Sequence, residues 1–233
     1  MTLALTILIP SIIGLILQGT FIAVEHKEKY VPAVILKGTA SVVFCILGYL
    51  GYSTHLLEGC DSSLPKFVFM GLLFGALGDI LLNLRFVFEK IGQKIFLAGI
   101  AAFLTGHILY LIALIPLSDS LLISIICGVV VAAVILTIIF KSFELKPAFK
   151  IFGIVYIGAV VLMTAIAIGN CITSGFEKSS VIYAIGALLF TVSDVVLIFN
   201  TFGPTTKFSL RITNLTLYYF GQLFIASCLF FCR

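Results

Sequence analysis

Residues 120–140 read SLLISIICGVVVAAVILTIIF, a stretch of twenty-one residues without an acid or a base. A helix of roughly 20 apolar residues crosses the ~30 Å hydrocarbon core of a bilayer, since each residue adds ~1.5 Å. Backbone groups in lipid must form hydrogen bonds within their own segment, so this stretch predicts a membrane-spanning helix. The period-two alternation of a membrane β-barrel is not visible.

Similar apolar runs fill the chain on both sides of this stretch. Of its 233 residues, 61% are hydrophobic and 10% are charged, too few polar residues to cover a soluble globule. The net charge of +4 is too small for a polybasic nucleic-acid binder. The sequence predicts an all-α polytopic membrane protein, a bundle of eight transmembrane helices in a single domain, residues 1–233. The expected helices are about 3–24, 31–52, 66–84, 95–116, 120–140, 149–169, 179–200 and 211–231.

Basic residues gather in alternate loops. The loops after the odd-numbered runs hold ten of them: Lys27, Lys29, Arg85, Lys90, Lys94, Lys141, Lys146, Lys150, Lys207 and Arg211. The other loops and the termini hold three: Lys66, Lys178 and Arg233. Loops rich in Lys and Arg stay in the cytoplasm, so both termini are expected outside. No basic segment precedes the first run, which favours a retained helix over a cleaved signal peptide.

The chain contains a faint internal repeat at an offset of 115 residues. The matching pairs are Gly71 and Gly186, Leu73 and Leu188, Asp79 and Asp194, Leu82 and Leu197, Gly106-His107 and Gly221-Gln222, Ala33 and Ala148, and Gly38 and Gly153. All eight runs keep register, so helices 1–4 and 5–8 would form two parallel four-helix repeats. Chance matching of small and apolar residues is the alternative, and the paired aspartates are the best evidence against it.

Four ionisable side chains lie inside the predicted helices, where a charge is costly and marks function. They are Lys37, Asp79, His107 and Asp194. Lys37 and the two aspartates lie roughly 8–9 Å from the cytoplasmic ends of their helices, and His107 and Gln222 roughly 16–18 Å. We therefore predict that both carboxyl groups converge in one pocket that opens toward the cytosol.

Further polar side chains are expected to support this site, because residues three or four apart share a helix face. Alternatively, Lys37 could reach the headgroups as an anchor, His107 could bond a neighbouring helix, and the tyrosines could be ordinary packing. The candidate supporting residues are Lys37, Asn83, His107, Tyr110, Ser193, Tyr218, Tyr219 and Gln222.

The charges of the predicted site point to acid chemistry. If one aspartate is ionised beside Lys37, the second does best as a neutral carboxylic acid, because a buried unpaired charge is costly. A proton donor beside a carboxylate is the pattern by which two acids divide their roles. The sequence lacks an HExxH metal motif, a GxSxG elbow and a Gly-rich phosphate loop, so we expect neither a metal nor a cofactor.

The six cysteines show no CxxC or CxxH spacing. Most lie within the predicted helices, where a cysteine is usually a small apolar residue in the packing. Cys60 and Cys171 could meet on the outer face, and the sequence leaves a bridge between them open.

Four blocks together resemble the YhhN family of multi-pass transmembrane lysoplasmalogenases. They are GALGDILL at 75–82, GIAAFLTGHILY at 99–110, GALLFTVSDVVL at 186–197 and YYFGQL at 218–223. The similarity covers helices 2–8 and is strongest in the third block, which is close to animal members. Lys37 takes the place of a lysine in the family's second helix.

The resemblance implies hydrolysis of the vinyl ether bond of lysoplasmalogens, which gives a fatty aldehyde and glycerophosphoethanolamine or glycerophosphocholine. It places the family's two aspartates at Asp79 and Asp194 and its histidine at His107. Vinyl ethers hydrolyse in acid, so we expect one aspartate to donate the proton and the other to stabilise the cation, in either assignment. Lys37, Tyr219 or Gln222 would hold the phosphate or the water.

Two other functions are compatible with intramembrane acids. A proton-coupled transporter is the first alternative, although no pair of Pro- or Gly-broken helices surrounds the predicted site. A non-catalytic lipid-binding or scaffold protein is the second. The expected partners are the lysophospholipid substrate and membrane lipids, not nucleic acid, and a homodimer stays open. Similarity to animal members favours the endoplasmic reticulum membrane, with a bacterial inner membrane as the alternative.

Overall fold

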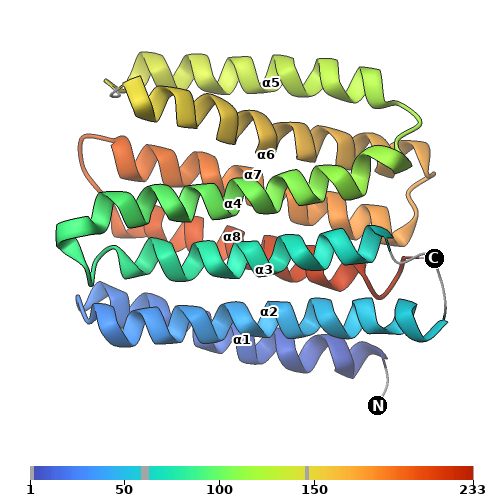
Figure 1. Cartoon of the computed structure of the whole chain (residues 1–233), viewed down its shortest axis with the longest axis horizontal. Coiled ribbons are helices and arrows are strands. Elements are labelled where there is room, and N and C mark those ends of the chain that lie inside the picture. The colour runs from blue at the N-terminus through green and yellow to red at the C-terminus, as the bar shows by residue number, and fades with distance from the viewer. Residues whose placement is uncertain (1–2, 59–62, 145–146, 233) are drawn as a thin grey trace. The chain divides into compact units, whose positions relative to one another are not determined.

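The computed structural model describes residues 3–58, 63–144 and 147–232. The described residues form eight α-helices and no strand, which confirms the predicted all-α class (Figure 1). Two 3-10 turns, Glu89–Ile91 and Ile115–Leu117, flank the fourth helix. The helices are α1 Leu3–His26, α2 Tyr30–Glu58, α3 Ser63–Leu84, α4 Gly92–Leu114, α5 Leu121–Ser142, α6 Pro147–Thr173, α7 Lys178–Phe202 and α8 Phe208–Cys228.

The helices begin close to the predicted positions, but α2 continues beyond its apolar run to Glu58. Polar residues in this last part fit the helix because they are hydrogen-bonded. The hydroxyls of Ser53 and Thr54 donate to carbonyls three residues earlier, at 2.8 and 2.7 Å. The His55 ring Nε2 lies 2.8 Å from the carbonyl oxygen of Leu229. Hydropathy marks only the apolar part of a helix, so it placed this end too early.

Seven of the helices in the described residues, α1 to α7, are long and apolar enough to cross a membrane. The chain is therefore a multi-pass integral membrane protein. The eighth, α8, has the length but a lower hydropathy, because it carries Arg211, Asn214, Gln222 and two adjacent tyrosines. Asn214 and Gln222 are buried, and a polar side chain that is shielded from lipid lowers the hydropathy of a helix without exposing a polar group to hydrocarbon.

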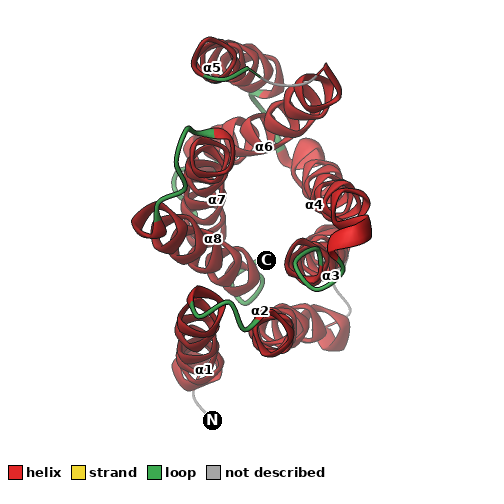
Figure 2. Cartoon of the chain, turned by 90° about the vertical axis from the view of Figure 1, so that its left-hand side faces the viewer, coloured by secondary structure: helices red, strands yellow, loops and turns green. Residues whose placement is uncertain are grey.

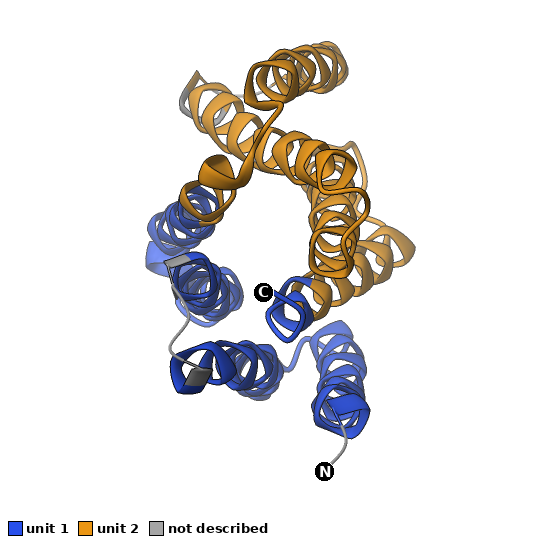
Figure 3. Cartoon of the chain, turned by 90° about the vertical axis from the view of Figure 1, so that its right-hand side faces the viewer, with its two compact units in different colours: residues 1–109, 225–233 blue, residues 110–224 orange. Residues whose placement is uncertain are grey.

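The described chain divides into two compact units (Figure 3). Residues 1–109 and 225–233 form unit 1, and residues 110–224 form unit 2. Within unit 1, α2 packs against α1 and α3, and within unit 2, α6 packs against α5 and α7 (Figure 2). The same order of packing thus occurs in each unit. The single membrane domain expected from the sequence stays a prediction.

The contact between the last two helices of each predicted repeat recurs at an offset of 115 residues. A Cβ atom added to Gly106 of α4 would lie 3.1 Å from the carbonyl oxygen of Gly71 in α3. A Cβ atom added to Gly221 of α8 would lie 2.9 Å from the carbonyl oxygen of Gly186 in α7. Glycine allows two helix backbones to approach this closely. A backbone contact repeated at the same offset supports an internal duplication over chance similarity.

Candidate functional site

In unit 1, a buried ion pair joins α2 to α3. The Nζ atom of Lys37 lies 3.3 Å from Oδ1 of Asp79. Only 1% of Lys37 and 4% of Asp79 is exposed. Two charges taken out of water need each other, because an isolated one would cost several kcal/mol. The lysine therefore points inward to the carboxylate and not outward to the headgroups.

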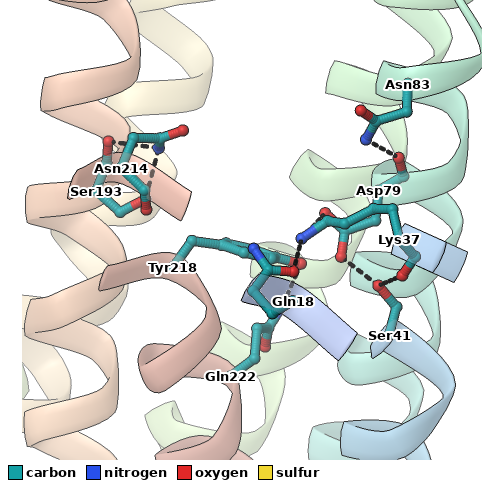
Figure 4. A network of polar contacts seen from close by, with 9 residues as sticks. All are labelled: Gln18, Lys37, Ser41, Asp79, Asn83, Ser193, Asn214, Tyr218 and Gln222. Carbon is teal, nitrogen blue, oxygen red and sulfur yellow. Dashed lines mark hydrogen bonds and ion pairs between the residues drawn. The ribbon is translucent and has the colours of Figure 1, made fainter. Parts of the chain in front are cut away.

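Neighbouring side chains complete the surroundings of this ion pair (Figure 4). The Ser41 hydroxyl, one turn after Lys37, donates to Oδ2 of Asp79 at 2.6 Å. Lys37 Nζ donates to Oε1 of Gln18 in α1 at 3.2 Å, and it lies 5.5 Å from the centre of the Phe21 ring. Both carboxylate oxygens of Asp79 therefore have a donor, and the ammonium has two favourable neighbours, Gln18 and Phe21, in addition to Asp79.

Two other predicted residues of unit 1 are Asn83 on α3, one turn after Asp79, and His107 on α4. The Asn83 amide donates to the backbone carbonyl of Asp79 at 2.9 Å. Its buried Oδ1 has no hydrogen-bond partner among the described residues. The His107 Nδ1 lies 2.7 Å from the carbonyl oxygen of Phe103, one turn earlier on α4. A neutral imidazole that donates from Nδ1 keeps Nε2 as an acceptor.

In unit 2, Asp194 of α7 is buried and 4% exposed. The phenol of Tyr156 in α6 donates to Oδ2 of Asp194 at 2.7 Å. Among the described residues of this unit, no cation lies within ion-pairing distance of the carboxyl group. Lys37 corresponds to Phe152 at the repeat offset. Phe152 is apolar and 36% exposed, so unit 2 has no ammonium at the position equivalent to Lys37.

Ser193, the neighbour of Asp194, fastens α7 to α8 (Figure 4). Its hydroxyl donates to the carbonyl of Asn214 at 3.0 Å. The Asn214 amide donates back to the carbonyl of Ser193 at 3.0 Å and lies 2.8 Å from its hydroxyl oxygen. These reciprocal bonds hold the turn of α7 that carries Asp194 against α8.

Three of the predicted supporting residues form a buried chain of hydrogen bonds within unit 2. The Tyr110 phenol donates to Oε1 of Gln222 at 3.3 Å. The Gln222 amide donates to the phenol oxygen of Tyr218 at 3.2 Å. Tyr219, also predicted, is fully buried on the same helix. An amide and phenols at this spacing can bind water or a hydroxyl group.

Residues 32–229 match the model of the YhhN family. The chain belongs to the YhhN family. No curated protein and no solved structure matches it. The matched region of this YhhN protein contains Lys37, Asp79, His107 and Asp194, whereas Gln18 of α1 lies before it.

Four polar residues of this YhhN protein that contact the predicted site residues were not themselves predicted as site residues: Gln18, Ser41, Tyr156 and Asn214. A hydroxyl or an amide in an apolar helix is common, so none of them stood out alone. The internal repeat contained one indication of two of them, because Ser41 and Tyr156 are 115 residues apart and both carry a hydroxyl group. Asp79 and Asp194 lie in different units, so their convergence in one pocket stays a prediction.

Two further expectations concern metals and thiols. Within the described ranges, no group of three or more His, Cys, Asp or Glu side chains could hold a metal ion. Cys171 is a buried thiol, and its suggested neighbour Cys60 lies outside the described residues. A bridge between these two cysteines therefore stays open.

Proposed function

We propose that this YhhN-family protein is an intramembrane hydrolase of lysoplasmalogens. It would cleave the vinyl ether bond and release a fatty aldehyde and glycerophosphoethanolamine or glycerophosphocholine. The observation that carries the proposal is a pair of buried aspartates 115 residues apart, each of which accepts a hydrogen bond from a hydroxyl group. The resemblance of the helices that carry them to lysoplasmalogenases points to the substrate.

The reaction needs one proton donor and one stabilising anion. A proton adds to the β carbon of the vinyl ether, the alkene carbon that is not bonded to oxygen. The π electrons of the double bond form the new C–H bond, and an oxocarbenium ion remains. Water adds to the cationic carbon and loses a proton, which gives a hemiacetal. The hemiacetal then releases the glycerol oxygen as an alcohol and becomes the aldehyde. A general acid and a nearby carboxylate are the two groups that accelerate these steps.

The depth of the ion pair suits this substrate. Lys37 lies seven residues after the start of α2, and Asp79 lies five before the end of α3. Each residue therefore lies about 8–10 Å, measured along the helix axis, from the nearer end of its own helix. The vinyl ether bond lies where the hydrocarbon chain meets glycerol, just below the headgroup. We propose that this end faces the cytoplasm, in the endoplasmic reticulum membrane or, in a prokaryote, the inner membrane.

The supporting residues would divide the remaining tasks. Lys37 would keep Asp79 ionised, because their pair is neutral as a whole. Tyr110, Gln222 and Tyr218 would bind the attacking water or a glycerol hydroxyl through their hydrogen-bonded chain. His107 would assist as a neutral acceptor.

The test is product analysis with the purified protein in detergent micelles. Micelles enclose no compartment and hold no proton gradient, so a transporter would show no activity in this assay. We expect aldehyde from a lysoplasmalogen and no fatty acid from the matched ester lysophospholipid. Glu89→Gln, a change in an exposed acid outside the α-helices, should leave the rate unchanged. Absence of aldehyde would favour the transporter or scaffold alternatives and refute the proposal.

A further inference from the structure

The two units contain the same hydroxyl–aspartate contact. Ser41 donates to Oδ2 of Asp79 at 2.6 Å, and Tyr156 donates to Oδ2 of Asp194 at 2.7 Å. In each pair the donor precedes the acceptor by 38 residues, and the two pairs are 115 residues apart. The donors lie on α2 and α6, the central helices of their units' packing. The same contact thus recurs at the repeat offset, as an internal duplication predicts.

The two copies differ in charge. The ammonium of Lys37 lies 3.3 Å from Asp79. At the repeat offset of 115 residues, the residue that corresponds to Lys37 is Phe152, which carries no charge. A buried carboxylate without a cation loses its hydration and gains no ionic partner, so the neutral acid is the more stable form. A buried carboxylate beside an ammonium is stabilised as the ion. The two equivalent positions thus hold one aspartate suited to each protonation state.

We propose that Asp194 is the proton donor of the reaction, that Asp79 is the ionised stabiliser, and that Tyr156 is the positioning residue of the donor. This assignment rests on the proposed function and supplies the roles that the sequence left open. The Tyr156 phenol occupies Oδ2 as a hydrogen-bond donor. The acid proton therefore resides on Oδ1, and Oδ1 is the atom that delivers it.

The transfer balances within the proposed reaction. The O–H bond at Oδ1 of Asp194 breaks and leaves its electron pair on the carboxylate, while the vinyl ether π pair takes the proton. The hydrogen bond from Tyr156 then stabilises the new anion, because bonds to a charged acceptor are the stronger ones. The water that adds to the oxocarbenium ion gives its proton back to Oδ1. Asp79 and Lys37 form and break no covalent bond during the reaction.

Infrared spectroscopy of the purified full chain without substrate tests the assignment. A neutral carboxyl group shows a C=O stretch that a carboxylate lacks. Asp79 and Asp194 are the only buried acids among the side chains whose burial the structure describes. We expect a neutral carboxyl band at neutral pH that disappears in Asp194→Asn and persists in Asp79→Asn. Its absence in the unmodified protein, or its loss in Asp79→Asn, would overturn the assignment.

Tyr156→Phe provides a second, independent variant. Removal of the hydrogen bond to the carbonyl oxygen should move the neutral band to higher frequency and lower kcat more than it changes KM. Ser41→Ala, the matched change in the other unit, should leave the band in place. An unmoved band in Tyr156→Phe, or a moved one in Ser41→Ala, would contradict the role of Tyr156, and this comparison stands even if Asp194→Asn does not fold.

The spectrum needs no turnover, which separates this inference from the proposed function. The expected bands together with no cleavage of any vinyl ether would refute the hydrolase and leave the protonation states standing. Cleavage of the vinyl ether with the bands reversed would keep the hydrolase and refute the assignment of roles.

Discussion

Lys37 is the cation that allows Asp79 to stay charged inside unit 1. Removal of one partner of a buried ion pair leaves an uncompensated charge, at a typical cost of about 3–5 kcal/mol. Lys37→Met should therefore lower the free energy of unfolding by about that amount, measured by denaturant titration in micelles. The double variant Lys37→Met with Asp79→Leu should recover most of the loss. Lys66→Met, at an exposed lysine, is the control, and an equal loss there would refute the reasoning.

Gln222 is the residue that joins two phenols in unit 2, since it accepts from Tyr110 and donates to Tyr218. A buried group that loses its hydrogen-bond partner costs about 1–3 kcal/mol. We expect Gln222→Met to reduce the free energy of unfolding by about this amount and to raise KM more than it lowers kcat. Gln93→Met, at an exposed amide, should change neither. An unchanged KM in Gln222→Met would contradict a role in binding.

At the scale of the helix, Gly106 and Gly221 set how closely the last two helices of each repeat approach. Alanine at either position places a Cβ about 3 Å from a backbone carbonyl, and the cost of overpacking is typically about 1–3 kcal/mol. Gly158 of α6 has nothing within 4 Å of such a Cβ, so Gly158→Ala should gain up to about 1 kcal/mol of helix propensity. Thermal unfolding of the three variants measures the difference. Equal melting temperatures would show that this packing is loose.

Helices and site residues were predictable from the sequence to different degrees. Hydropathy found the elements because hydrocarbon demands apolar side chains, whatever the tertiary structure. It could not place the end of α2, which depends on the contact of His55 with Leu229. The aspartates and Lys37 were predictable because a charge in lipid is conspicuous, whereas Ser41 and Tyr156 acquire meaning only from the carboxyl group that each contacts.

At the scale of the whole molecule, the presence of one buried aspartate in each unit leads to two distinct expectations. Two independent sites would leave each single variant about half of its activity. A reaction that needs both carboxyl groups, as the proposed hydrolysis does, makes each aspartate indispensable, since a general acid contributes about 10²–10⁴-fold and electrostatic stabilisation about 10²–10³-fold. We expect Asp79→Asn and Asp194→Asn each to reduce kcat at least about a hundredfold. The kcat of the double variant should be only slightly lower than that of the less active single variant. Aldehyde release from equal amounts of folded protein measures this. Half activity in either single variant would mean that the two carboxyl groups serve separate sites, because only a shared reaction makes the loss of one group equivalent to the loss of both.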